Sequence, residues 1–106
     1  MKRLILLAIL IFGSIGAKVQ ATDLVKPRVL ISTDIGGTDP DDNQSMADLL
    51  MYTDCFDLEG LVSSPSYGSG SREEILRMID LYEKDLPKLS KHIKGLMSPT
   101  ELRAIT

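Results

Sequence analysis

The sequence predicts an α/β domain built around a parallel sheet, and three observations support that class. Residues 28–33 and 56–64 have the composition of β-strands, and each is followed by a segment with helical spacing. Residues 29–31 form a continuous apolar run, which is typical of a parallel strand covered on both faces. The order strand, helix, strand, helix requires a right-handed crossover between parallel strands.

The segments after the two predicted strands have the apolar spacing of helices. Residues 43–53 follow the first strand and place Met46, Leu49 and Leu50 at core spacing. The clearest helix opens at Ser71, which is predicted to form a capping box with Glu74. Pro87 is expected to end this helix and start a new segment, because proline lacks the backbone donor. The apolar face of the helix comprises Ile75, Leu76, Ile79, Tyr82 and Leu86.

A last helix begins close to the end of the chain. Residues 98–101, Ser-Pro-Thr-Glu, form a second predicted capping box with proline at the first helical position. Two strands alone cannot make a sheet that is covered on both faces, because such sheets need more neighbours. We therefore expect an incomplete domain. Either the chain is a fragment, which we favour, or it completes itself with a partner such as a second copy in a homo-oligomer.

Residues 1–21 have the layout of a secretory signal peptide. Two basic residues precede an apolar run, and a small-x-small cleavage site ends at Ala21. A stable membrane anchor is the alternative, but the apolar run is too short to span a bilayer and Lys18 closes it. We expect a secreted or periplasmic protein whose mature domain covers residues 22–106.

The charge balance argues against a nucleic-acid partner. Residues 1–21 hold three of the 12 Lys and Arg and no acid, which leaves 9 basic against 15 acidic side chains, net −6. Nucleic-acid binding depends on Lys and Arg at the phosphates. Cys55, the sole cysteine, cannot form an internal disulfide and is expected at the edge of the core. His92, the sole histidine, lies among lysines and is expected at the surface.

The segment directly after the first strand carries the candidate site. Four aspartates fall within nine residues there, and no Lys or Arg lies between Val29 and Ser71. Carboxylates this close repel one another unless a cation lies among them, and Ca²⁺ prefers oxygen ligands. The simpler interpretation, that these are turn and N-cap residues, explains one or two of them. The four residues are Asp34, Asp39, Asp41 and Asp42.

The predicted topology places two loops on the same rim. Ligands of open α/β sheets bind beyond the carboxyl ends of the strands, where both the aspartate loop and residues 65–70 should lie. Gly36 and Gly37 permit a sharp turn there, so that carboxylates from both sides of the turn can converge. Tyr67 in the second loop is a candidate for stacking on a sugar ring, against the alternative of packing on its neighbours.

This arrangement resembles the N-terminal signature of the nucleoside hydrolases. Asp34 follows a strand, a glycine-rich turn comes next, and the pair Asp41-Asp42 opens a helix, similar to their compact Asp-x-Asp-x-Gly-x-Asp-Asp. The longer motif of this chain, residues 33–45, is most similar to that of the nucleoside-hydrolase-like domain of secreted cellulose-binding proteins. The similarity continues through residues 56–61 and 98–103. It implies a Rossmann-like, parallel-sheet domain of which this chain is the N-terminal part.

The resemblance implies a secreted, calcium-dependent hydrolase of N-glycosyl or glycosidic bonds in a nucleoside or carbohydrate. Asp34 and Asp42 would hold the Ca²⁺, Asp34 would also act as general base on a water, and Asp41 would hold a sugar hydroxyl. The alternative function is a non-catalytic carbohydrate (cellulose)-binding protein that keeps the fold. Further candidate contacts for metal or substrate are Asp39, Asn43 and Tyr67.

Two other interpretations are disfavoured by what surrounds the motif. Residues 34–38 also match the phosphate loop of sugar kinases of the hexokinase and actin superfamily, but a helix follows here where that fold has a second strand. An EF-hand loop starting at Asp39 fails, because Gln44 and Leu50 occupy the positions of its required glycine and glutamate.

Overall fold

The computed structural model describes residues 25–65, 67–68 and 70–106. The predicted signal peptide and its cleavage site lie outside these residues. Within them, no helix is long and apolar enough to cross a membrane. The elements, in chain order, are β1 (Arg28–Thr33), α2 (Asp41–Leu50), β2 (Asp57–Ser63), α3 (Arg72–Leu89) and α4 (Pro99–Ala104).

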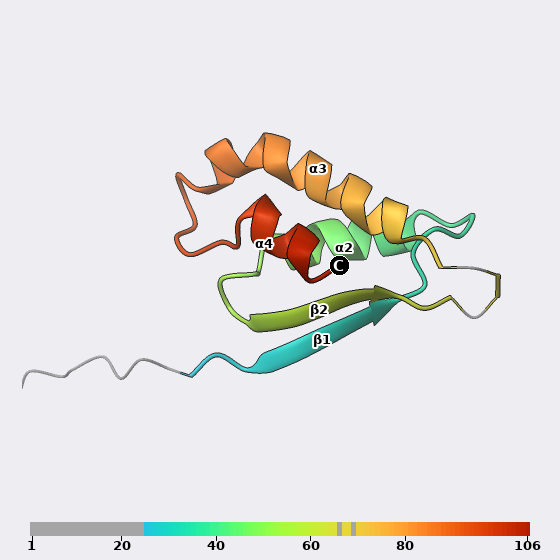
Figure 1. The fold of residues 1–106 in the computed structure, drawn as a ribbon. Coiled ribbons are helices and arrows are strands. Elements are labelled where there is room, and N and C mark those ends of the chain that lie inside the picture. Colours follow the sequence, from blue (N-terminus) through green and yellow to red (C-terminus); the bar gives the residue numbers. More distant parts are fainter. Residues whose placement is uncertain (1–24, 66, 69) are drawn as a thin grey trace, which may run out of the picture.

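Strands β1 and β2 form a parallel pair, which confirms the predicted α/β class (Figure 1). The register pairs Arg28 with Asp57 and Thr33 with Ser63, with one irregularity after Val29 where β2 holds an extra residue. Both strands therefore end at the same edge of the sheet. The loop after β1 and the loop after β2 start from that edge, as the topology predicted.

All three helices lie on one face of the sheet (Figure 1). Side chains of β1 alternate between exposed and half-buried, and Leu30 is 63% exposed. The expectation that β1 is covered on both faces is therefore wrong for the described residues, because the helices described pack against one face only. The buried core between sheet and helices consists of Ile35, Met46, Leu50, Leu58, Leu61, Ile75, Met78, Ile79, Tyr82 and Leu102.

The helix boundaries differ from the prediction in two places. Helix α2 begins at Asp41 and ends at Leu50, earlier at both ends than residues 43–53. Helix α3 continues through Pro87 to Leu89, so the prediction that Pro87 ends it is wrong. Proline this close to the C-terminal end removes a single hydrogen bond, while Leu86 and Leu89 gain contact with the core.

The two capping boxes differ in completeness. Ser98 and Glu101 form both reciprocal bonds, so the box that starts α4 is confirmed. Ser71 Oγ accepts from the Glu74 N–H, but the Ser71 N–H donates to Ser63 Oγ at 2.7 Å instead of to the Glu74 carboxylate. This ties the start of α3 to the end of β2.

The sole histidine and the sole cysteine of the chain are both at the surface. His92 is exposed, as predicted. Cys55 is also exposed, so its predicted place at the core edge is wrong. It lies in the turn between α2 and β2, where no element of the described chain covers it.

Candidate functional site

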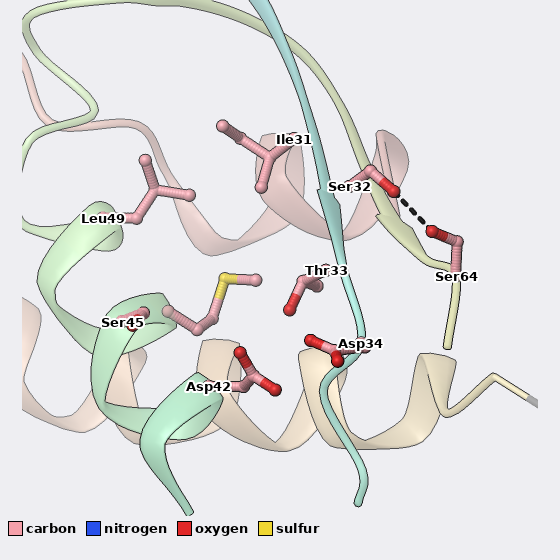
Figure 2. Close-up of a pocket in the computed structure, with 9 residues that line it drawn as sticks. Ile31, Ser32, Thr33, Asp34, Asp42, Ser45, Leu49 and Ser64 are labelled. Atoms are coloured by element: carbon pink, nitrogen blue, oxygen red, sulfur yellow. Dashed lines mark hydrogen bonds between the residues drawn. The ribbon is translucent and has the colours of Figure 1, made fainter. Parts of the chain in front are cut away.

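Asp34 and Asp42 meet in one cavity at the carboxyl edge of the sheet. Asp34 directly follows β1, and Asp42 lies in the first turn of α2. Figure 2 shows their carboxylates pointing into the same space, with the Thr33 side chain beside them. The cavity holds about 480 Å³, and its polar lining consists of Ser32, Thr33, Asp34, Asp42, Ser45 and Ser64.

The charge of Asp34 acts directly on Asp42. A hydrogen bond with Asp34 raises the pKa of the Asp42 carboxyl, and partial loss of solvation and the charges of Asp34, Asp41 and Asp39 raise it further. The positive end of the α2 dipole favours a carboxylate at this position. The lining of the cavity contains no cationic side chain, so Asp34 and Asp42 form an electronegative site.

The carboxylates of Asp39 and Asp41 bind backbone N–H groups at the start of α2. Pro40 is the N-cap residue and makes no side-chain capping bond. The Asp39 carboxylate accepts from the Asp41 N–H at 3.4 Å, and the Asp41 carboxylate accepts from the Asp42 N–H at 2.9 Å. Neither side chain lines the cavity that Asp34 and Asp42 share. Local bonds to backbone N–H groups at the start of α2 thus account for two of the four aspartates.

The first turn of α3 holds the start of α2 in place. The Asn43 side-chain amide donates to Glu74 Oε2 at 3.1 Å and to Met78 Sδ at 3.5 Å. Arg77 binds the same Glu74 carboxylate through Nε and Nη2. Asn43 therefore faces α3 and not the cavity, and its contact fixes the position of the neighbouring Asp42.

The loop after β1 is fixed on both sides of Asp34. The Ile35 side chain is fully buried, and its N–H donates to Thr33 Oγ1 at 3.2 Å. Gly36 then turns with φ of +103° against the start of α3, where an added Cβ would lie 2.5 Å from Ser71 Cβ. Asp34 is thus held between a strand end and a turn that only glycine fits.

The donor set suits a hard cation but does not complete its shell. The polar groups of the cavity are carboxylates and hydroxyls, which are ligands that Ca²⁺ accepts, and two like-charged carboxylates converge there. Within the described part of the chain, no three His, Cys, Asp or Glu side chains gather so that they could hold a metal. Asp34 and Asp42 fit as a partial set of ligands.

A second cavity shares one lining residue, Asp34, with the first. It holds about 310 Å³ and is lined by residues from both rim loops. Tyr67 lines it and is 94% exposed, so among the described residues no neighbour covers its ring. The lining residues are Asp34, Ile35, Gly36, Gly37, Thr38, Pro65 and Tyr67.

Sequence reasoning missed the hydroxyl groups of the first cavity. Ser45 lies three residues after Asp42, which puts both on one face of α2, and this spacing could have identified it. Ser32 and Ser64 join β1 to the segment after β2 through their hydroxyls, 2.5 Å apart. Their pairing depends on strand register, which the sequence does not display.

Comparisons with known proteins find similarity over most of the chain. Residues 28–106 match a family model described as "Cellulose-binding Sde182, nucleoside hydrolase-like domain". Among solved structures, the chain is similar to a nucleoside hydrolase-related protein of Saccharophagus degradans that is associated with carbohydrate metabolism, with 32% identity and a TM-score of 0.63. The match covers 76% of this chain and 20% of that one, so the chain spans a fifth of that relative's length. No curated protein matches the chain.

Proposed function

This chain belongs to the nucleoside hydrolase-like domain family of cellulose-binding Sde182 proteins, as the aspartate motif predicted, and on that premise we propose a calcium-dependent glycoside hydrolase. Its substrate class is a carbohydrate or nucleoside, in which water cleaves the glycosidic or N-glycosyl bond. The observation that carries the proposal is the convergence of the Asp34 and Asp42 carboxylates in one oxygen-lined cavity.

In this proposal Asp34 and Asp42 hold the calcium ion and Asp34 is the general base. Calcium supplies the positive charge that offsets their repulsion and favours deprotonation of a nearby water. Asp34 accepts the proton of the attacking water, whose oxygen bonds to the anomeric carbon. The bond to the leaving group breaks, and that group takes up a proton from solvent. Ser45 and Thr33 line the same cavity and offer hydroxyls to the sugar.

Asp41 has a different role in this proposal from the one that the resemblance implied. Its carboxylate caps the Asp42 N–H at 2.9 Å. A sugar hydroxyl would have to compete with that bond. The main role of Asp41 in this proposal is therefore to orient Asp42, and a contact with the substrate is its secondary role.

A carbohydrate-binding protein without catalysis is the second candidate function. The family description names cellulose binding, and that is the observation in its favour. Two carboxylates in a hydroxyl-lined cavity can hold a sugar through hydrogen bonds without any reaction. Under this proposal the full chain is retained on cellulose, and no sugar is released.

Calcium dependence is tested by thermal unfolding of the full chain with and without calcium. A ligand at 100 times its Kd stabilises the native state by about 2.7 kcal/mol. Asp42→Asn should abolish most of this gain, yet raise the melting temperature without calcium, because it removes repulsion with Asp34. Asp48→Asn is the matched control, since Asp48 is exposed on the same helix and does not line the cavity.

The result that contradicts the proposal is equal stabilisation by calcium of the Asp42→Asn and Asp48→Asn variants. Hydrolysis is then assayed by release of reducing sugar or free base from glycosides in the presence of calcium. Release that is lost in Asp34→Asn supports the hydrolase. Retention on cellulose without release in the wild-type protein supports the binding protein instead.

A further inference from the structure

The first turn of α3 packs against the loop that carries Asp34. Gly36, two residues after Asp34, turns against Ser71, the N-cap residue of that helix. A Cβ added to Gly36 would lie 2.5 Å from Ser71 Cβ and 3.8 Å from Glu74 Cγ, so the loop is closely packed on this helix start. Ser71 is itself anchored to β2, because its N–H donates to Ser63 Oγ at 2.7 Å. The position of Asp34 therefore depends on the start of α3.

The same turn of α3 holds the segment that carries Asp42. Asn43 directly follows Asp42, and its side-chain amide donates to Glu74 Oε2 at 3.1 Å. Arg77 donates to the Glu74 carboxylate through Nε at 3.1 Å and Nη2 at 3.0 Å. The hydrogen bonds from Arg77 and then Asn43 hold the pKa of Glu74 below its ordinary value, so the group remains a charged acceptor at neutral pH. A charged acceptor binds an amide more strongly than a neutral one.

Glu74 is half-buried and lies close to both flanks of the candidate site without lining the cavity. Two carboxylates that bind one Ca²⁺ must each place an oxygen about 2.3–2.6 Å from it, so their separation decides the affinity. Asp34 and Asp42 come from different elements, a strand end and a helix start, and their like charges repel. A contact outside the cavity that holds both flanks keeps the two carboxylates near that separation before the ion arrives.

We propose that Glu74 is a positioning residue for the calcium site and sets the separation of the Asp34 and Asp42 carboxylates by holding Asn43. This inference rests on the proposed function, because it needs calcium between the two carboxylates. It goes beyond that function by assigning part of the calcium affinity to a contact between α2 and α3, outside the cavity. Asn43 acts through its place in α2 and not as a ligand of the ion.

The test is calorimetric titration of calcium into the full chain, well below the unfolding midpoint of every variant. Glu74→Ala should raise the calcium Kd about tenfold, the lower end of the effect typical for groups that orient metal ligands. Glu74→Gln should raise it less, because its amide oxygen still accepts from the Asn43 side chain. Glu73→Ala is the matched control, since Glu73 is an exposed carboxylate of the same turn and lies outside the cavity. It measures the effect of removing one negative charge from this turn.

Asn43→Ala separates positioning from a purely structural role. It breaks the same contact but keeps the Arg77–Glu74 ion pair and the Ser71 cap, so it gives the answer even where Glu74→Ala does not fold. The double variant should bind calcium as weakly as either single variant, because both substitutions remove one interaction. A merely structural contact would lower the urea midpoint of the calcium-free variants and leave the calcium Kd unchanged.

Equal calcium Kd values for Glu74→Ala and Glu73→Ala overturn this inference and leave the proposed calcium site standing. Effects of Asn43→Ala and Glu74→Ala that add in the double variant also overturn it, because Asn43 then acts on the ion independently of Glu74. If the wild-type protein binds no calcium, the proposed function fails and this inference fails with it.

Discussion

Gly36→Ala tests whether the turn after Asp34 is built for glycine. The backbone there has φ of +103°, and a new Cβ would lie 2.5 Å from Ser71 Cβ and 3.2 Å from Ser71 Oγ. The strained backbone costs about 1–3 kcal/mol, and forcing an atom into packed space costs about 1–3 kcal/mol more. We therefore expect the free energy of unfolding to fall by roughly 2–6 kcal/mol, a large part of the total for a typical domain.

The assay is urea unfolding of the full chain, with Gly37→Ala as the matched control. Gly37 has no positive φ, and a Cβ there would touch nothing, so its substitution should stay within about 0.5 kcal/mol of wild type. A second variant separates clash from strain. Ser71→Gly removes the contacted Cβ and costs only a few tenths of a kcal/mol as an N-cap, so it should partly restore the stability of Gly36→Ala.

One result would refute the reasoning directly: equal urea midpoints for Gly36→Ala and Gly37→Ala. A Gly36→Ala protein that is destabilised but not relieved by Ser71→Gly would instead assign the whole cost to backbone strain. The slope of the transition should stay unchanged in all variants, because the surface exposed on unfolding is the same.

Two further predictions concern other parts of the chain. Hydrogen bonds from the Ser98 backbone N–H and then from its hydroxyl hold the pKa of Glu101 below its ordinary value. The contribution of Glu101 to stability is therefore present above the ordinary pKa of about 4.3 and is lost as the pH falls through the lowered pKa. In Glu101→Gln the urea midpoint should depend less on pH between about pH 5 and 3 than in the wild-type protein, and an equal dependence in both proteins would contradict this. We also propose that residues 1–21 direct secretion, so the intact mass of the protein exported from its source should fit a chain beginning at Thr22, and an exported chain that retains Met1 would contradict it.

Local sequence signals predicted most of the elements. Apolar runs and spacing located both strands and helices α2 and α3, because their hydrophobic faces are encoded within a few turns of chain, and a capping box located α4. The box at Ser98 was predicted in full, since both of its partners lie within one turn. Pro87 misled the prediction because packing of Leu86 and Leu89 on the core outweighed a local rule.

The candidate site was predicted in part. The sequence indicated that carboxylates gather after β1, and the rule for open α/β sheets placed them at the strand ends. The family resemblance already singled out Asp34 and Asp42, which share the cavity, but local spacing alone could not separate them from Asp39 and Asp41, whose carboxylates accept from backbone N–H groups at the start of α2. That distinction depends on where α2 starts and how it is oriented.

By itself, then, the sequence determined the class of the fold, the family and the segment that carries the site, because periodicity, caps and a dense run of aspartates are all local properties. Only the tertiary structure decided which side chains meet. The contact of Asn43 with Glu74 and the fit of Gly36 against Ser71 join residues more than thirty positions apart. Such contacts follow from the packing of α3 against α2 and the strand ends, and no short stretch of sequence contains both partners.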